Sequence, residues 1–112
     1  MTRSGIHFPD VIDLTTKASD GTIRLVVAET EALTGHHVPA LKRKLDNYVA
    51  FVQSGELARS QRSTGDRSVL IRVDLYAEPD QLIVIFLRHY RTVLENQGLG
   101  LEVSLNQEDL AL

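Results

Sequence analysis

The chain has 112 residues, of which 43% are hydrophobic and 24% charged, and its net charge at pH 7 is −3. This length makes one domain with one core, and the acidic balance argues against general attraction to nucleic acid or anionic lipid. The sequence contains no cysteine. That excludes disulfides, thiolate metal sites and cysteine nucleophiles, and it fits a reducing cytosol.

The N-terminal residues contain no apolar run of the kind that a signal peptide needs. The most apolar window, residues 82–87, is far shorter than the roughly 20 residues of a membrane span. We therefore expect a cytoplasmic protein with no membrane partner and no nucleic-acid partner.

Two runs rich in β-branched residues, 10–18 and 22–28, flank the turn Ser19-Asp20-Gly21. An Asp-Gly turn between such runs predicts a β-hairpin, because glycine accepts positive φ without steric cost. The polar residues 29–37, which include Gly35, indicate a loop after the hairpin.

The spacing of apolar residues changes to three and four after this loop, which predicts a helix. Pro39 suits its first turn and Gly55 its end. A loop rich in serine and arginine follows at residues 59–67. The apolar face of the predicted helix comprises Val38, Leu41, Leu45, Tyr48, Val49 and Val52.

Alternating apolar and polar residues at 69–76 predict a strand with one buried face. Pro79 and Asp80 open a second predicted helix, which stops at Gly98. Alternation at residues 99–106 predicts a last strand. The second helix has a wide apolar face that comprises Leu82, Ile83, Phe86, Tyr90, Val93 and Leu94.

The predicted order is therefore β-β-α-β-α-β, in an α+β fold. A two-layer sandwich fits best, with a four-stranded sheet that carries both helices on one face and leaves the other face open. The domain spans residues 10–106, after an N-terminal arm at 1–9 and before a C-terminal tail at 107–112 that we expect to fray.

The open sheet face is the most unusual feature of the predicted fold, because polar and apolar side chains share it. Opposite charges on neighbouring strands would pair there. The face is either a partner or homodimer surface anchored by Tyr76 and Val26, or a solvated face held by weak salt bridges. Asp74 and Glu102 lack the pocket and nucleophile that would make them an acid/base pair. By alternation the face presents Arg24, Val26, Arg72, Asp74, Tyr76, Glu102 and Ser104.

The sequence holds one histidine cluster, His36-His37, just before the first helix. A stable zinc site takes three or four protein ligands, and nothing at ligand spacing accompanies this pair. His7 lies in the N-terminal arm and His89 in the second helix, so neither joins the pair on sequence grounds. We interpret His36-His37 as solvated loop residues and predict no metal site.

The basic residues and the glycines form no binding motif either. The run Lys42-Arg43-Lys44 fans around the polar side of the first helix, since successive helical residues lie about 100° apart. Three arginines of the mid-chain loop, Arg59, Arg62 and Arg67, are interpreted as solvated. No phosphate-binding loop or nucleophile elbow is present, so we predict no cofactor and no enzyme activity.

Four short patterns occur in this order: Asp10-Val11-Ile12-Asp13-Leu14, Lys44-Leu45-x-x-Tyr48-x-x-Phe51-x-x-x-Gly55-Glu56-Leu57, Phe86-Leu87 and Gly98-x-x-Leu101-x-Val103. Over roughly residues 9–105, this arrangement resembles a family of small bacterial proteins of unknown function. Family members often carry a Trp before the first helix and a Tyr-Pro pair after a Gly-Glu-Leu, and this chain has neither. The resemblance implies a fold and a bacterial origin and supplies no activity.

These observations favour a non-catalytic binding or assembly module of a bacterial cytoplasm that forms a homodimer through the open face. One alternative is a small-ligand receptor or enzyme with a site near the loop before the first helix, where His36, His37 and nearby acids would act. Another is an immunity-type or antitoxin-like protein that binds a different protein. Ligand screening separates the first alternative from the others, because a bound ligand stabilises the fold.

Overall fold

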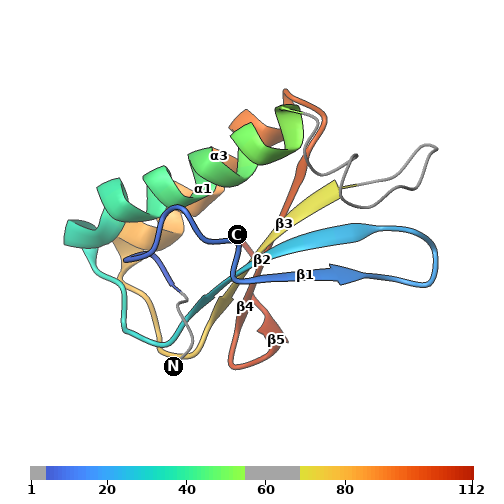
Figure 1. Ribbon diagram of the computed structural model, residues 1–112. Helices are drawn as coiled ribbons and strands as arrows, with labels where there is room; N and C mark the ends of the chain where they lie inside the picture. The colour runs from blue at the N-terminus through green and yellow to red at the C-terminus, as the bar shows by residue number, and fades with distance from the viewer. Residues whose placement is uncertain (1–4, 55–68) are drawn as a thin grey trace.

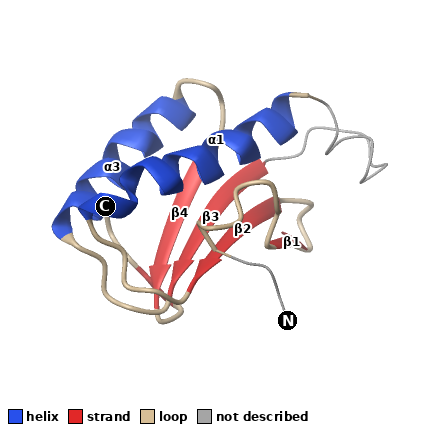
Figure 2. Ribbon diagram, turned by 60° about the vertical axis from the view of Figure 1, so that its left-hand side comes forward, coloured by secondary structure: helices blue, strands red, loops and turns tan. Residues whose placement is uncertain are grey.

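The computed structural model describes residues 5–54 and 69–112. They form a five-stranded mixed sheet with two helices packed on one face, in two layers (Figures 1 and 2). The expected α+β class, with both helices on the same side of the sheet, is confirmed. The strands are β1 (Leu14–Lys17), β2 (Ile23–Glu29), β3 (Val69–Leu75), β4 (Gly100–Leu105) and β5 (Glu108–Asp109). The helices are α1 (Val38–Gln53), preceded by the 3₁₀ turn η1 (Gly35–His37), and α3 (Gln81–Glu95).

The strands lie in the sheet in their chain order, β1-β2-β3-β4-β5. The central strands β2, β3 and β4 are parallel, and β1 and β5 pair antiparallel at the two edges. The predicted hairpin joins β1 to β2: Gly21 has a φ of +94°, and the side chain of Asp20 accepts the N–H of Thr22 at 2.9 Å. The first strand is shorter than the predicted run and begins at Leu14.

The prediction of a four-stranded sheet and a fraying tail is wrong, because β5 forms a second hairpin with β4. Asn106 and Gln107 turn the chain with φ of 52° and 69°. Two successive residues at positive φ suit a tight hairpin, but the pair contains no glycine, so the sequence signal for the turn is weak. Beyond β5, the N–H of Leu110 donates to the carbonyl of Val103 at 2.8 Å. Leu110 and Leu112 then pack against the core.

The core lies between the inner face of the sheet and the two helices, where the predicted alternation of β3 and β4 is observed. In α3, however, the predicted apolar face is partly wrong: Leu82 is 55% exposed, because the buried face of the helix begins at the next residue, Ile83. That stripe comprises Ile83, Leu87, Tyr90 and Leu94. Within the described ranges, no helix has the length and apolar character needed to cross a membrane.

Candidate functional site

The residues predicted for the open sheet face do share one face of the sheet. In register, Val26 of β2 lies beside Arg72 of β3, which lies beside Glu102 of β4. Ala28, Asp74 and Ser104 form the next row. Figure 1 shows both helices on the opposite side of these strands.

Two arginines and two carboxylates on this face form what we call the charge network: Arg24, Arg72, Asp74 and Glu102. The Glu102 carboxylate accepts from Arg24 at 2.9 Å and from Arg72 at 3.2 Å. Arg72 also donates to Asp74 at 2.7 Å, and the Ser104 hydroxyl donates to the same Asp74 oxygen at 2.6 Å. The hydrogen bond from Arg24, supported by the charges of both arginines, lowers the pKa of Glu102. The network is neutral as a whole, since its two arginines balance its two carboxylates.

The two expected anchors differ in exposure. Tyr76, one residue past β3, is 41% exposed, whereas Val26 is only 3% exposed and offers no surface to a partner. Leu14 of β1 pairs in register with Val26, so it lies on the open face, where it is 53% exposed. Leu14 is therefore an exposed apolar residue of this face that sequence reasoning missed.

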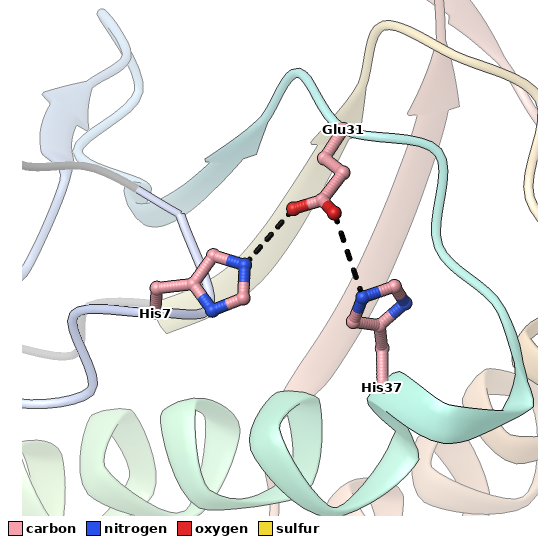
Figure 3. A group of neighbouring side chains, drawn as sticks. All are labelled: His7, Glu31 and His37. Atoms are coloured by element: carbon pink, nitrogen blue, oxygen red, sulfur yellow. Dashed lines mark hydrogen bonds and ion pairs between the residues drawn. The ribbon is translucent and has the colours of Figure 1, made fainter.

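A second cluster was predicted only in part: His37 and unspecified nearby acids were candidates for a small-ligand site, whereas His7, which is distant from them in the sequence, was not. His7 of the N-terminal arm and His37 of η1 both point toward the carboxylate of Glu31, which follows β2 (Figure 3). The Nε2 atom of His7 lies 2.9 Å from one carboxylate oxygen, and that of His37 lies 3.7 Å from the other. The hydrogen bond from His7 is the main cause that lowers the pKa of Glu31. We call these three residues the His–Glu–His cluster.

The interpretation of His36-His37 as an equivalent solvated pair is therefore wrong for one of its members. His36 is exposed, but His37 is partly buried, and its Nδ1 accepts the N–H of Thr34 at 2.9 Å. His7, which seemed unrelated to the pair, has its ring centroid 6.2 Å from that of His37 in an edge-on arrangement. No local spacing in the sequence could have signalled this contact.

The N-terminal arm reaches the cluster because a buried ion pair fixes it to the domain. Lys44 was expected on the polar side of α1, but its side chain is 0% exposed. Its ammonium donates to Asp13 and to the carbonyls of Phe8 and Val11, each at 2.7 Å. The other Asp13 oxygen accepts the N–H groups of Gly5 and Ala28 at 3.0 and 2.9 Å. All three protons of Lys44 are used, so this lysine holds the arm and is not free to react.

Glu29, at the end of β2, holds both sides of the same cluster. One of its carboxylate oxygens accepts the N–H of Ile6 and the other accepts the N–H of Glu31, both at 2.9 Å. Its side chain is buried, with 5% of the residue exposed. The Glu29 carboxylate thus binds both the backbone of Ile6, which precedes His7, and the backbone of Glu31. A cleft of about 380 Å³ lies beside the cluster and is lined by Ile6, His7, Pro9, Pro39, Ala40 and Arg43.

Two groups of predicted residues cannot be placed, since they lie outside the described ranges. These are the helix-ending Gly55 with the Glu56-Leu57 that follows it, and the arginines of the mid-chain loop, Arg59, Arg62 and Arg67.

Three of the residues behind the resemblance lie together in the structure. Asp13, Lys44 and Tyr48 form one buried group, in which the Tyr48 hydroxyl accepts the N–H of Asp13 at 2.9 Å and donates to Val26 at 2.7 Å. Comparison with curated proteins and with solved structures finds no match. Residues 4–107 match the family of unknown function DUF6572. The chain belongs to that family.

Proposed function

We propose that this protein is a non-catalytic assembly module of a bacterial cytoplasm, which pairs with a second copy of itself through the open sheet face. The observation that carries the proposal is the alternation of charge within one register row, where Arg72 on β3 lies beside Glu102 on β4. The cytoplasmic setting is supported by a sequence without cysteine.

A two-fold axis between β3 and β4, parallel to the strands, would place Arg72 of each copy over Glu102 of the other. A two-fold interface uses the same patch on both copies, so the patch must complement itself. The charge network meets this requirement because it is neutral and its opposite charges are side by side. Two sheets stacked in this way would keep their strands nearly aligned, as in other face-to-face packings.

Apolar contacts would come from the margins of the face. Leu14 and Tyr76 are 53% and 41% exposed, and a tyrosine is a frequent anchor at protein interfaces. Arginine side chains, which cover the centre, are also enriched there. The opposite face of the sheet is already covered by α1 and α3, as Figure 2 shows.

Sedimentation equilibrium of the purified protein tests this proposal. The wild-type chain should have twice the mass of the monomer, and Tyr76→Asp or Arg72→Glu should return it to the monomer mass. The double exchange Arg72→Glu with Glu102→Arg should recover dimerisation only in part. It restores the opposite charges of this pair within and between copies, but it places like charges beside Arg24 and Asp74. Lys17→Glu is the matched charge-reversal control, since Lys17 pairs with Ile23, which faces the helices, and so lies off the open face.

A monomeric wild-type protein at concentrations of about 1 mM would refute the homodimer. A dimer that is unaffected by both single substitutions, while each variant unfolds cooperatively near the wild-type temperature, would refute its placement on the open face.

A second candidate function is a small-ligand receptor or enzyme with its site near the loop before α1. The His–Glu–His cluster favours it, because three titratable side chains converge there and one of them, His7, lines a cleft. Thermal unfolding in the presence of common metabolites is the test: a ligand at 100 times its dissociation constant stabilises the fold by about 2.7 kcal/mol. The absence of any shift across such a panel would count against this function.

A further inference from the structure

The His–Glu–His cluster has a geometry that a pair of surface hydrogen bonds does not require. One ring nitrogen of His7, one of His37 and one carboxylate oxygen of Glu31 all lie within 4.8 Å of one another. Each comes from a separate segment, and both rings present the same nitrogen toward the carboxylate (Figure 3). An ordinary exposed His–Glu pair would explain the contact of His7, but here a second ring, held from behind by Thr34, brings a third ligand atom to the same carboxylate.

We infer that His7, Glu31 and His37 form a binding site for a divalent transition-metal ion of the zinc class. Two imidazole nitrogens and one carboxylate oxygen are a ligand set that zinc accepts, with a fourth position left for water or another ligand. Among residues 5–54 and 69–112, this is the one group of three or more such side chains with ligand atoms this close.

The observed spacing is close to what tetrahedral coordination needs. Zinc bonds of about 2.0–2.1 Å place neighbouring ligand atoms roughly 3.3 Å apart. Nε2 of His7 lies 2.9 Å from one Glu31 oxygen and Nε2 of His37 lies 3.7 Å from the other, and ligand atoms of all three residues lie within 4.8 Å of one another. Metal entry therefore requires side-chain movements of about 1–2 Å, which the exposed side chains of His7 and Glu31, at 58% and 51%, allow.

His37 can present an unprotonated Nε2 to a metal without losing a partner for its other nitrogen. Nδ1 lies 2.9 Å from the backbone nitrogen of Thr34 and 3.4 Å from its hydroxyl oxygen. With a metal on Nε2, the ring proton moves to Nδ1 and donates to that hydroxyl. Such outer hydrogen bonds orient the histidine ligands of metal sites. The N–H group of Thr34, which is released in this state, belongs to an exposed residue and can donate to water.

The backbone around the site is held in place before any metal binds. Glu29 accepts hydrogen bonds from Ile6, which precedes His7, and from Glu31 itself. The arm that carries His7 is fixed further by Lys44, which donates to the carbonyl of Phe8. Only side chains have to move, so little ordering of the chain opposes binding.

Isothermal titration of the untagged 112-residue chain with Zn²⁺ tests the site, and the absorption spectrum of bound Co²⁺ reports its ligands. We expect one ion per chain and an intense visible Co²⁺ spectrum typical of low coordination number. His7→Ala, Glu31→Gln and His37→Ala should each weaken Zn²⁺ binding at least about tenfold. Losing a residue that only hydrogen-bonds a metal ligand already costs about that much affinity, and losing a ligand should cost no less. His36→Ala is the matched control, since His36 is the exposed neighbour outside the cluster, and it should bind Zn²⁺ as the wild type does.

Three results would overturn the inference. One is the absence of stoichiometric Zn²⁺ binding at concentrations up to about 1 mM. Another is retention of wild-type affinity in the three cluster variants, and the third is an equal loss in His36→Ala. Because Glu31 is exposed and Glu31→Gln preserves its shape, this variant should melt within about 2 °C of the metal-free wild type, so that its loss of Zn²⁺ binding reports ligation and not misfolding.

Discussion

Lys44 and Asp13 form an ion pair of 2.7 Å whose side chains are 0% and 1% exposed. The pair joins α1 to the segment before β1, and the remaining donors and acceptors of both groups bind the backbone of the arm. Burying two charges is costly, and the gain from pairing them depends on satisfying every remaining proton and lone pair. The arm supplies those partners, so the docking of the arm and the burial of the pair depend on each other.

Lys44→Met should lower the free energy of unfolding by about 3–5 kcal/mol, because it leaves the Asp13 carboxylate buried without its cation. Urea denaturation followed by circular dichroism measures this loss. The matched control is Lys42→Met, since Lys42 pairs with Asp46 on the surface of the same helix, where it is 58% exposed. That exposed pair contributes at most about 1 kcal/mol. Similar losses for the two variants would contradict the stabilising role of the buried pair.

Tyr48→Phe should cost about 1–3 kcal/mol, because it removes the hydroxyl that bonds Asp13 and Val26 and leaves both backbone groups unsatisfied in the interior. Burial raises the pKa of the Tyr48 hydroxyl, which favours its protonated, donating form. Tyr76→Phe is the control, since Tyr76 is 41% exposed, and in the monomer it should change stability by less than about 0.5 kcal/mol. Equal effects in urea denaturation would show that the Tyr48 hydroxyl is not an interior link.

Much of the fold follows from short-range patterns in the sequence. Alternation in β3 and β4 and the Asp-Gly turn of the first hairpin predict their elements because each depends on neighbouring residues alone. Lys44 was misplaced because its charge was taken to indicate exposure. Its position indicates burial: it lies three residues after Leu41 and four before Tyr48, on the apolar stripe of α1.

The His–Glu–His cluster could not be predicted from such patterns. It requires the arm with His7 to return to the end of β2, and the arm does so through Lys44 and Glu29, two charged residues that a pattern of apolar spacing ignores. The residues of the open face were predictable, since alternation assigns Arg72 and Glu102 to it. Which of their charges form ion pairs was not predictable, because that depends on the strand order, which places Arg72 beside Glu102.

Acid should weaken the open face through Glu102, whose pKa is lowered by its hydrogen bond from Arg24 and by Arg72. A carboxylate with a lowered folded-state pKa contributes stability that is complete above its ordinary value of 4.5 and is lost as the pH falls through the lowered value. Because the side chain is 35% exposed, solvent screening limits this contribution to at most about 1 kcal/mol. Urea denaturation between pH 7 and pH 3 should therefore show a smaller acid loss for Glu102→Gln than for the wild type. Parallel curves for the two proteins would refute this role of Glu102.

Gly5→Ala should be more harmful than Gly21→Ala, although both glycines have a φ above +90°. A Cβ at Gly21 would meet nothing within 4 Å, so alanine there suffers only the backbone strain of positive φ, about 1–2 kcal/mol. A Cβ at Gly5 would lie 2.7 Å from Oε1 of Glu29, the atom that accepts the N–H of Ile6.

Gly5→Ala must therefore displace either the arm or the Glu29 carboxylate, and both hold the His–Glu–His cluster in place. The expected result is a larger loss of unfolding free energy than in Gly21→Ala, together with weaker Zn²⁺ binding at a temperature where both variants are folded. Urea denaturation and isothermal titration measure the two effects. If Gly21→Ala lowered Zn²⁺ affinity as much as Gly5→Ala did, the effect would come from general destabilisation and not from the docking of the arm.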